Sequence, residues 1–118
     1  MSRVLVPKEV IDAAKRVVAS ITAGEFVELE AGGQARRVPA QAIQRVITEY
    51  GRTFVPHPDD ASFMAGFDAV QVQGLPLRWQ LLVDLWTVEE SRSDLTLCLE
   101  AMLVDNEVSI EITDLRVM

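Results

Sequence analysis

The chain has 118 residues, of which 49% are apolar and 25% charged, so it is long enough and apolar enough for one globular domain. Its net charge of −7 is uneven, because residues 1–56 hold eight basic and six acidic side chains whereas residues 57–118 hold three and twelve. Nucleic acids and anionic membranes are bound through lysine and arginine. The acidic half therefore argues against both and favours a basic protein as partner.

Cysteine content and hydropathy point to a cytoplasmic protein. Cys98 is the only cysteine, so no disulfide can form within the chain, as is usual in a reducing compartment. No apolar run approaches the ~18 residues that cross a bilayer. The first residues also lack the apolar stretch of a signal peptide. We therefore expect one cytoplasmic domain over residues 1–118.

Two helices are expected in the first half of the chain. The first begins at Pro7, which suits the first turn of a helix, and ends near Gly24. Its apolar stripe follows helical spacing and consists of Val10, Ile11, Ala14, Val17, Val18 and Ile21. Residues 25–30 alternate briefly and fit either a short strand or a helical turn. The second helix runs from near Pro39 to Gly51, a suitable C-terminal cap.

From residue 67 onward the apolar period changes from helical to alternating, which is typical of strands. Four strands are predicted, at residues 67–73, 78–86, 95–104 and 107–117. Asp105 and Asn106 are typical of a two-residue hairpin turn, and the segment 55–60, with two prolines, is expected to be a loop. This order predicts an α+β domain in which two N-terminal helices pack on a four-stranded antiparallel meander sheet.

The sequence carries no constellation typical of a catalytic or metal site. One histidine, His57, and one cysteine are too few for a zinc site, and Asp59 and Asp60 lack the spacing of a calcium loop. No nucleophile with a recognisable motif accompanies His57. We therefore expect no enzyme activity, no catalytic residue, no cofactor and no metal. His57 is expected to be a solvated loop residue and Cys98 a structural thiol.

The densest polar segment is the expected loop at residues 86–94. In one interpretation Glu89 and Glu90 contact basic side chains of a partner, with Trp86 as the apolar anchor. In the other, the loop is a self-contained turn in which Arg92 clamps Glu89 or Asp94. With the acidic residues of the following strands, the candidate partner-binding residues are Trp86, Glu89, Glu90, Arg92, Asp94, Asp105, Glu107 and Glu111.

The run LWTVEESRSDLTL at residues 85–97 resembles a signature of a small bacterial domain family of unknown function, with the pattern LWTxEEGRSDLTL. The ending DLRV at residues 114–117 and the EYG at residues 49–51 are similar too, so the resemblance covers residues 40–118. Ser91 stands where that family has glycine. In size, acidity and element order the family is similar to immunity proteins of bacterial toxin systems, including contact-dependent inhibition. The layout also resembles cystatin-like and NTF2-like folds.

Three functions follow as hypotheses. The first is a non-catalytic, immunity-type inhibitor that neutralises a basic bacterial toxin through an acidic surface. The second is a small-molecule-binding or enzymatic domain, with a cavity lined by Trp79, Tyr50 and His57. The third is a homodimeric accessory domain, in which two copies share an apolar sheet face.

Overall fold

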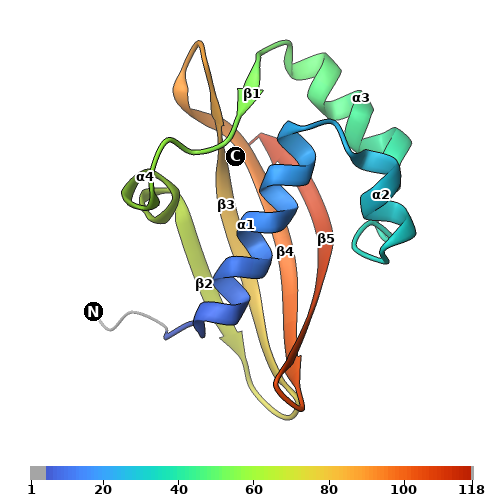
Figure 1. Cartoon of the computed structure of the whole chain (residues 1–118), viewed down its shortest axis with the longest axis vertical. Helices are drawn as coiled ribbons and strands as arrows, with labels where there is room; N and C mark the ends of the chain where they lie inside the picture. Colours follow the sequence, from blue (N-terminus) through green and yellow to red (C-terminus); the bar gives the residue numbers. More distant parts are fainter. Residues whose placement is uncertain (1–4, 118) are drawn as a thin grey trace.

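A computed structural model describes residues 5–117 and has an α+β architecture, which confirms the predicted fold class (Figure 1). In chain order the elements are α1 (Lys8–Thr22), α2 (Phe26–Ala31), α3 (Ala40–Tyr50), β1 (Phe54–Val55), α4 (Asp60–Ala65), β2 (Phe67–Val72), β3 (Leu77–Thr87), β4 (Ser91–Val104) and β5 (Glu107–Val117).

The strands β2, β3, β4 and β5 form the antiparallel meander that the alternation predicts. The short β1 pairs with the end of β3, so β1 and β2 occupy successive stretches of the same β3 edge. β5 is the opposite edge of the sheet. Asp105 and Asn106, with φ of 51° and 64°, join β4 to β5 as a two-residue hairpin turn, which confirms the prediction at this point.

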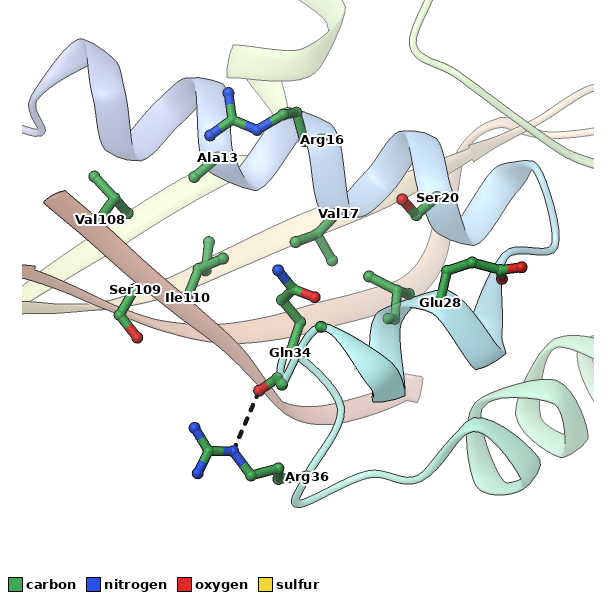
Figure 2. A pocket seen from close by; sticks show the side chains of 13 residues that line it. Ala13, Arg16, Val17, Ser20, Glu28, Gln34, Arg36, Val108, Ser109 and Ile110 are labelled. Carbon is green, nitrogen blue, oxygen red and sulfur yellow. Dashed lines mark hydrogen bonds between the residues drawn. The ribbon is translucent and has the colours of Figure 1, made fainter.

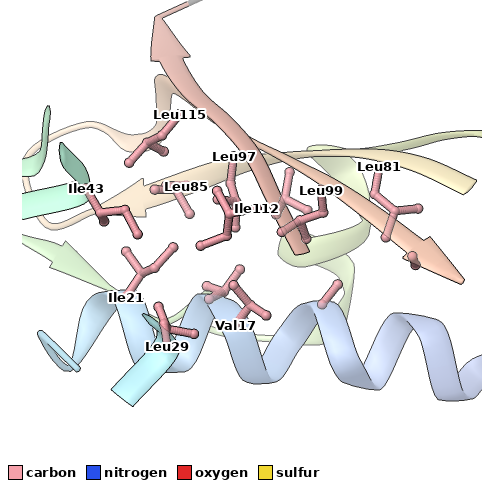
Figure 3. Packing of buried hydrophobic residues seen from close by; sticks show 14 of the residues in the cluster. Val17, Ile21, Leu29, Ile43, Leu81, Leu85, Leu97, Leu99, Ile112 and Leu115 are labelled. Atoms are coloured by element: carbon pink, nitrogen blue, oxygen red, sulfur yellow. The ribbon is translucent and has the colours of Figure 1, made fainter. Parts of the chain in front are cut away.

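One face of the sheet is covered by α1, while α2 and α3 lie beside β5 (Figure 1). Each large aliphatic side chain contributes roughly 1.5–3 kcal/mol on burial, so this layer holds the helices on the sheet. Figure 3 shows the packed side chains, which are Val17 and Ile21 from α1, Leu29 from α2, Ile43 from α3, and Leu81, Leu85, Leu97, Leu99, Ile112 and Leu115 from the sheet.

The opposite face of the sheet has no covering layer among residues 5–117. Long polar side chains cross it and form ion pairs, such as Arg92 with Asp84 and Arg116 with Asp114. The apolar face is therefore covered within one chain, by α1. The third hypothesis, a homodimer that shares an apolar sheet face, would therefore need a surface other than the face that α1 covers.

The region between α3 and β2 is more regular than the sequence suggests. Residues 55–60 were expected to be a loop, but Val55 belongs to β1 and Asp60 begins α4. Asp59 makes this short helix possible, because its carboxylate accepts a hydrogen bond from the Ser62 N–H at 2.7 Å, as an N-cap does. The segment at residues 25–30, for which two interpretations were open, is mostly helical and forms α2.

Candidate functional site

The predicted loop at residues 86–94 is a hairpin with a three-residue turn, which corrects the sequence analysis. β3 continues to Thr87 and β4 begins at Ser91, which leaves only Val88 to Glu90 between them. The Thr87 hydroxyl accepts a hydrogen bond from the Glu90 N–H at 2.9 Å. Ser91 has a φ of 64°, as in hairpins where a left-handed residue after the turn forms a bulge. Most of the polar residues at positions 86–94 belong to the ends of β3 and β4. Composition alone therefore suggested a longer loop than the structure has.

The carboxylate of Glu89 is bound within the molecule. One of its oxygens accepts a hydrogen bond from the Thr53 N–H and the other from the Thr53 hydroxyl, each at 2.9 Å. The backbone N–H bond and then the hydroxyl bond hold the pKa of Glu89 below its ordinary value. The Val88 N–H also donates to the Thr53 carbonyl, at 3.0 Å. The turn is therefore tied to the segment just before β1.

Glu90 connects the same turn to the end of α3. It accepts a hydrogen bond from the Tyr50 hydroxyl at 2.8 Å, and Arg52 Nε lies 3.7 Å from its other oxygen. The Tyr50 oxygen in turn accepts from the Asp94 N–H at 3.2 Å. Burial, and after it the bond to Glu90, raise the pKa of Tyr50. Both glutamates of the turn are thus engaged in holding the hairpin against neighbouring segments.

Arg92 pairs with Asp84, whereas Glu89 or Asp94 was the expected partner. Its Nε and Nη2 atoms each lie 2.7 Å from Oδ2 of Asp84. The other carboxylate oxygen, Oδ1, accepts a hydrogen bond from the Thr96 hydroxyl at 2.8 Å. One carboxylate on β3 therefore holds two side chains of β4. The self-contained interpretation of this segment is the one that its contacts favour.

His57 is a partly buried structural residue, which corrects the expectation of a solvated loop histidine. Its Nε2 lies 2.8 Å from the backbone oxygen of Asp84, so Nε2–H donates to that carbonyl. The imidazole meets Phe63 edge-on, with ring centroids 5.1 Å apart, and Trp86 at 5.9 Å. Trp86 is half-buried by these contacts and is only partly available as an anchor.

The other acidic residues of the predicted surface lie far apart. Asp94 is exposed beside the hairpin turn, whereas Asp105 and Glu107 lie at the opposite end of β4 (Figure 1). At about 3.3 Å per residue, the eleven positions from Asp94 to Asp105 span roughly 35 Å. Glu111 lies midway along β5, where its carboxylate is 3.5 Å from Arg37. The predicted residues therefore form two separate groups at opposite ends of β4, with Glu111 between them, and not one surface.

The end that carries Asp105 and Glu107 also exposes three aliphatic side chains. Leu75, Leu77 and Val104 are 88%, 38% and 46% exposed, and the β2–β3 and β4–β5 connections lie together at this end (Figure 1). We call these five residues the distal tip. Leu77 lies on the helix-covered face of the sheet and Val104 on the open face, so the exposed side chains surround this end of the sheet. Exposed apolar side chains beside charged ones are typical of binding surfaces.

The aliphatic residues of the distal tip were not predicted from the sequence, although the sequence indicated that one of them is exposed. Leu75 lies between Gly74 and Pro76, in a connection too short to bury a large side chain. An apolar residue of that size in a turn has no covering element and must stay in solvent. The neighbouring Val104 is different, because it alternates with the inner-face residue Leu103 and so lies on the face of the sheet that no helix covers.

A second surface feature is a cleft of about 460 Å³ between α1, α2 and β5, here called the helix–edge cleft (Figure 2). Val108 and Ile110 of β5 line one side of it, and Arg16 projects from α1 on the other. The Gln34 side chain extends into the space between them (Figure 2). Arg36, whose Nε lies 3.5 Å from the Gly33 oxygen, lines the mouth. The cleft thus combines a strand edge with two arginines.

The three residues that were expected to line a small-molecule cavity make different contacts in the part of the chain that the structure describes. Trp79 is 2% exposed and belongs to the core, and Tyr50 bonds to Glu90. His57 instead lines a separate hollow of about 180 Å³ together with Phe63.

Among residues 5–117, no group of three His, Cys, Asp or Glu side chains is placed to hold a metal ion. Within the same residues, no helix is both long and apolar enough to span a membrane.

Residues 18–118 match the family model described as Domain of unknown function (DUF7668). The chain belongs to this family. The DUF7668 match contains the whole sheet, the hairpin at residues 86–94 and the distal tip, whereas Arg16 of the helix–edge cleft lies just before it. No curated protein and no solved structure matches the chain.

Proposed function

We propose that this DUF7668 domain is a non-catalytic protein-binding domain, and specifically an immunity-type inhibitor that neutralises a basic bacterial protein toxin. The observation that carries the proposal is the distal tip, where Leu75, Leu77 and Val104 are exposed beside Asp105 and Glu107. Binding energy in protein interfaces is concentrated in a few apolar anchors that become buried on association. The three exposed aliphatic side chains at this end of the sheet supply such anchors.

The charge of the chain supports a basic partner for the same surface. Residues 57–118 hold twelve acidic and three basic side chains, and this half includes the whole distal tip. An acidic surface speeds the encounter with a basic protein and repels acidic ones. A toxin that acts on nucleic acid carries a basic active surface, so a small acidic inhibitor is suited to cover it.

The internal contacts of the hairpin move the proposed contact surface away from residues 86–94. Glu89 and Glu90 already accept hydrogen bonds from Thr53 and Tyr50, and Arg92 is paired with Asp84. A partner that competed for these side chains would have to break bonds that hold the hairpin. Asp105 and Glu107 form no hydrogen bond or ion pair through their side chains among residues 5–117, so they are free to meet a basic partner.

The proposal is tested by capturing the partner of the tagged chain from its host and expressing that partner alone. We expect one basic protein, bound one to one and released as salt rises from 50 to 500 mM, which stops growth when expressed without the inhibitor. Co-expression of the chain should restore growth. The variants Asp105→Lys/Glu107→Lys and Leu75→Ser should fail to restore it.

The matched control is Glu30→Lys/Glu49→Lys, which changes the charge equally at exposed helical positions away from the tip. It should restore growth as the unmodified chain does. A captured partner that is harmless when expressed alone would contradict the inhibitor role. Equal rescue by the tip variants would contradict the assignment of the surface.

A further inference from the structure

β5 is an edge strand, and the geometry of its hairpin determines which of its backbone groups face outward. In a two-residue hairpin the residues that flank the turn, here Val104 and Glu107, form a hydrogen-bonded pair. Hydrogen-bonded and non-hydrogen-bonded pairs alternate along an antiparallel ladder. Val108 and Ile110, paired with Leu103 and Ala101, are therefore non-hydrogen-bonded positions. Their N–H and C=O groups point away from the sheet.

One contact in the structure confirms this alternation independently. The Ile112 N–H, two residues further along the same edge, donates to the Gln34 carbonyl at 2.7 Å. The connection between α2 and α3 thus pairs with the edge at Ile112 only. Among residues 5–117, no backbone group pairs with the outward side of Val108 or Ile110. The chain therefore pairs with the outward side of β5 at Ile112, through Gln34, and leaves the outward backbone groups of Val108 and Ile110 unpaired.

The helix–edge cleft lies over this unpaired stretch of β5. Val108 and Ile110 are only partly buried, and α1 stands above them with Val17 and Arg16 (Figure 2). A strand added to a sheet lies about 4.8 Å from the edge strand. An added strand would pair with the outward groups of Val108 and Ile110 and turn alternate side chains into the cleft. Its remaining side chains would face the open side of the sheet.

The charges in the cleft select the side chains of such a strand. Arg16 and Arg36 take part in no ion pair among residues 5–117, and Glu28 is the only acidic residue in the lining. The cleft is thus a basic site on an acidic protein. A carboxylate on the added strand would be attracted to the arginines, whereas a lysine would be repelled. Val17, Val108 and Ile110 favour aliphatic side chains next to it.

We propose that the β5 edge at Val108–Ile110 binds an extended segment of a partner protein as an added strand. Every second side chain of that segment faces the helix, and these side chains are aliphatic except for an acidic one that meets the arginines. Strand addition of this kind takes its affinity from main-chain hydrogen bonds and its specificity from the pockets for alternate side chains. The inference rests on the proposed protein-binding function and assigns a second contact surface, distinct from the distal tip.

A second copy of the chain fits the cleft less well than a separate partner. If two β5 edges paired with each other, the side chains turned into the cleft would be Val108, Ile110 and Ile112 of the other copy. None of these carries a charge to meet Arg16 or Arg36. The unpaired arginines are therefore better explained by a strand that contains an acidic residue.

The edge geometry is tested first, by hydrogen exchange of backbone amides measured by NMR. The N–H groups of Val108 and Ile110 should exchange rapidly, while those of Ser109 and Glu111, which face β4, and of Ile112, which is bound by Gln34, should be protected. Equal protection of residues 108–112 would contradict an unpaired edge and overturn the proposal.

Binding is tested by selecting from a library of displayed random dodecapeptides on the full chain. Enriched peptides should alternate with a period of two and carry an acidic residue. The best synthetic peptide should slow exchange at Val108 and Ile110. Selection on the Arg16→Glu/Arg36→Glu variant should enrich basic residues instead, while Arg45→Glu, at an exposed position on α3, should leave the acidic preference unchanged. Failure to enrich an alternating acidic pattern would overturn the proposal.

A backbone variant separates strand addition from simple charge attraction. Val108→Pro removes an outward N–H that the β4–β5 ladder does not use, and proline is tolerated at such edge positions. It should weaken the selected peptide at least about tenfold, the effect of one lost hydrogen bond of ~1.4 kcal/mol. Val108→Ala removes most of the same side chain but keeps the N–H, so it should weaken the peptide less than Val108→Pro does. Equal affinity of the two variants, with unchanged unfolding curves, would overturn the proposal.

The two surfaces fail independently. Asp105→Lys/Glu107→Lys should abolish growth rescue while the selected peptide still binds, and Arg16→Glu/Arg36→Glu should abolish peptide binding. If the tip variant lost peptide binding, the peptide would depend on the distal tip, which would contradict a separate site on the β5 edge. Growth rescue without any peptide selection would overturn only the strand-addition proposal.

Discussion

Arg92 places both Nε and Nη2 at 2.7 Å from one oxygen of Asp84, across the hairpin that joins β3 to β4. The second carboxylate oxygen of Asp84 accepts a hydrogen bond from the Thr96 hydroxyl. The Asp84 N–H donates to the Gly66 carbonyl, and the Asp84 carbonyl accepts from Nε2 of His57. A single residue of β3 thus connects β4, the end of α4 and the segment before α4. The segment at residues 85–97 contributes to this connection through Arg92, so this part of the chain has a structural role.

Replacing Arg92 with alanine should lower the free energy of unfolding. Asp84 is 21% exposed in its side chain and loses its charged partner, while Arg92 is 57% exposed, so the expected loss is about 1 kcal/mol. Urea unfolding at pH 7 measures it. Arg116→Ala is the control, because Arg116 is equally exposed but lies 3.4 Å from Asp114, whose side chain is 47% exposed. A loss in the control as large as in Arg92→Ala would show that the cross-strand geometry is unimportant.

Stability should depend on pH through Glu89. Hydrogen bonds from Thr53 lower the pKa of this carboxylate in the folded chain, so its stabilising effect is present above the ordinary value of 4.5. That effect is lost as the pH falls through the lowered folded-state pKa. Glu89→Gln should therefore unfold at lower urea concentration than the unmodified chain at pH 7, and the difference should shrink toward pH 3.

The control for this pH dependence is Glu107→Gln, at an exposed position where the side chain makes no hydrogen bond among residues 5–117. Its urea midpoint should follow that of the unmodified chain at both pH values. A Glu89→Gln variant with the same midpoint shift at pH 7 and pH 3 would show that the loss does not arise from ionisation of Glu89.

Ser91 occupies a left-handed backbone position, with a φ of 64°. A residue with a Cβ pays roughly 1–2 kcal/mol there, whereas glycine does not. Glycine also loses more chain entropy on folding, so Ser91→Gly should raise stability by about 0.5 kcal/mol net. Ser91→Val should lower it, because a β-branched side chain tolerates this conformation least. Urea unfolding of the two variants measures both effects. A loss of stability in Ser91→Gly would contradict backbone strain at this position.

The Cys98 thiol should be protected from modification in the folded chain. It is 7% exposed on the open face of the sheet, and burial raises its pKa. A disulfide reagent at pH 8 should therefore react with the native chain at least about tenfold more slowly than with the chain in urea. Rapid reaction of the native protein, with one thiol modified per chain, would contradict the structural role of Cys98.

Periodicity predicted most of the regular structure. Apolar spacing indicated α1 and α3, alternation indicated β2 to β5, and Asp105–Asn106 indicated the turn, because each pattern reflects a face that must be buried. The short elements were missed or left open. α4 and β1 have too few residues to show a period, and they form because Asp59 caps one and the β3 edge pairs with the other.

The sequence by itself determined the chemistry available to this domain: its acidic half, its single thiol and the polar run at residues 86–94. Only the tertiary structure decided how those groups are used. Arg92 meets Asp84 because the pairing of β3 with β4 makes them diagonal neighbours across the two strands, and Glu89 meets Thr53 because β1 pairs with β3. Asp94 and Asp105 lie only eleven residues apart in sequence, yet an extended strand separates them to opposite ends of the molecule.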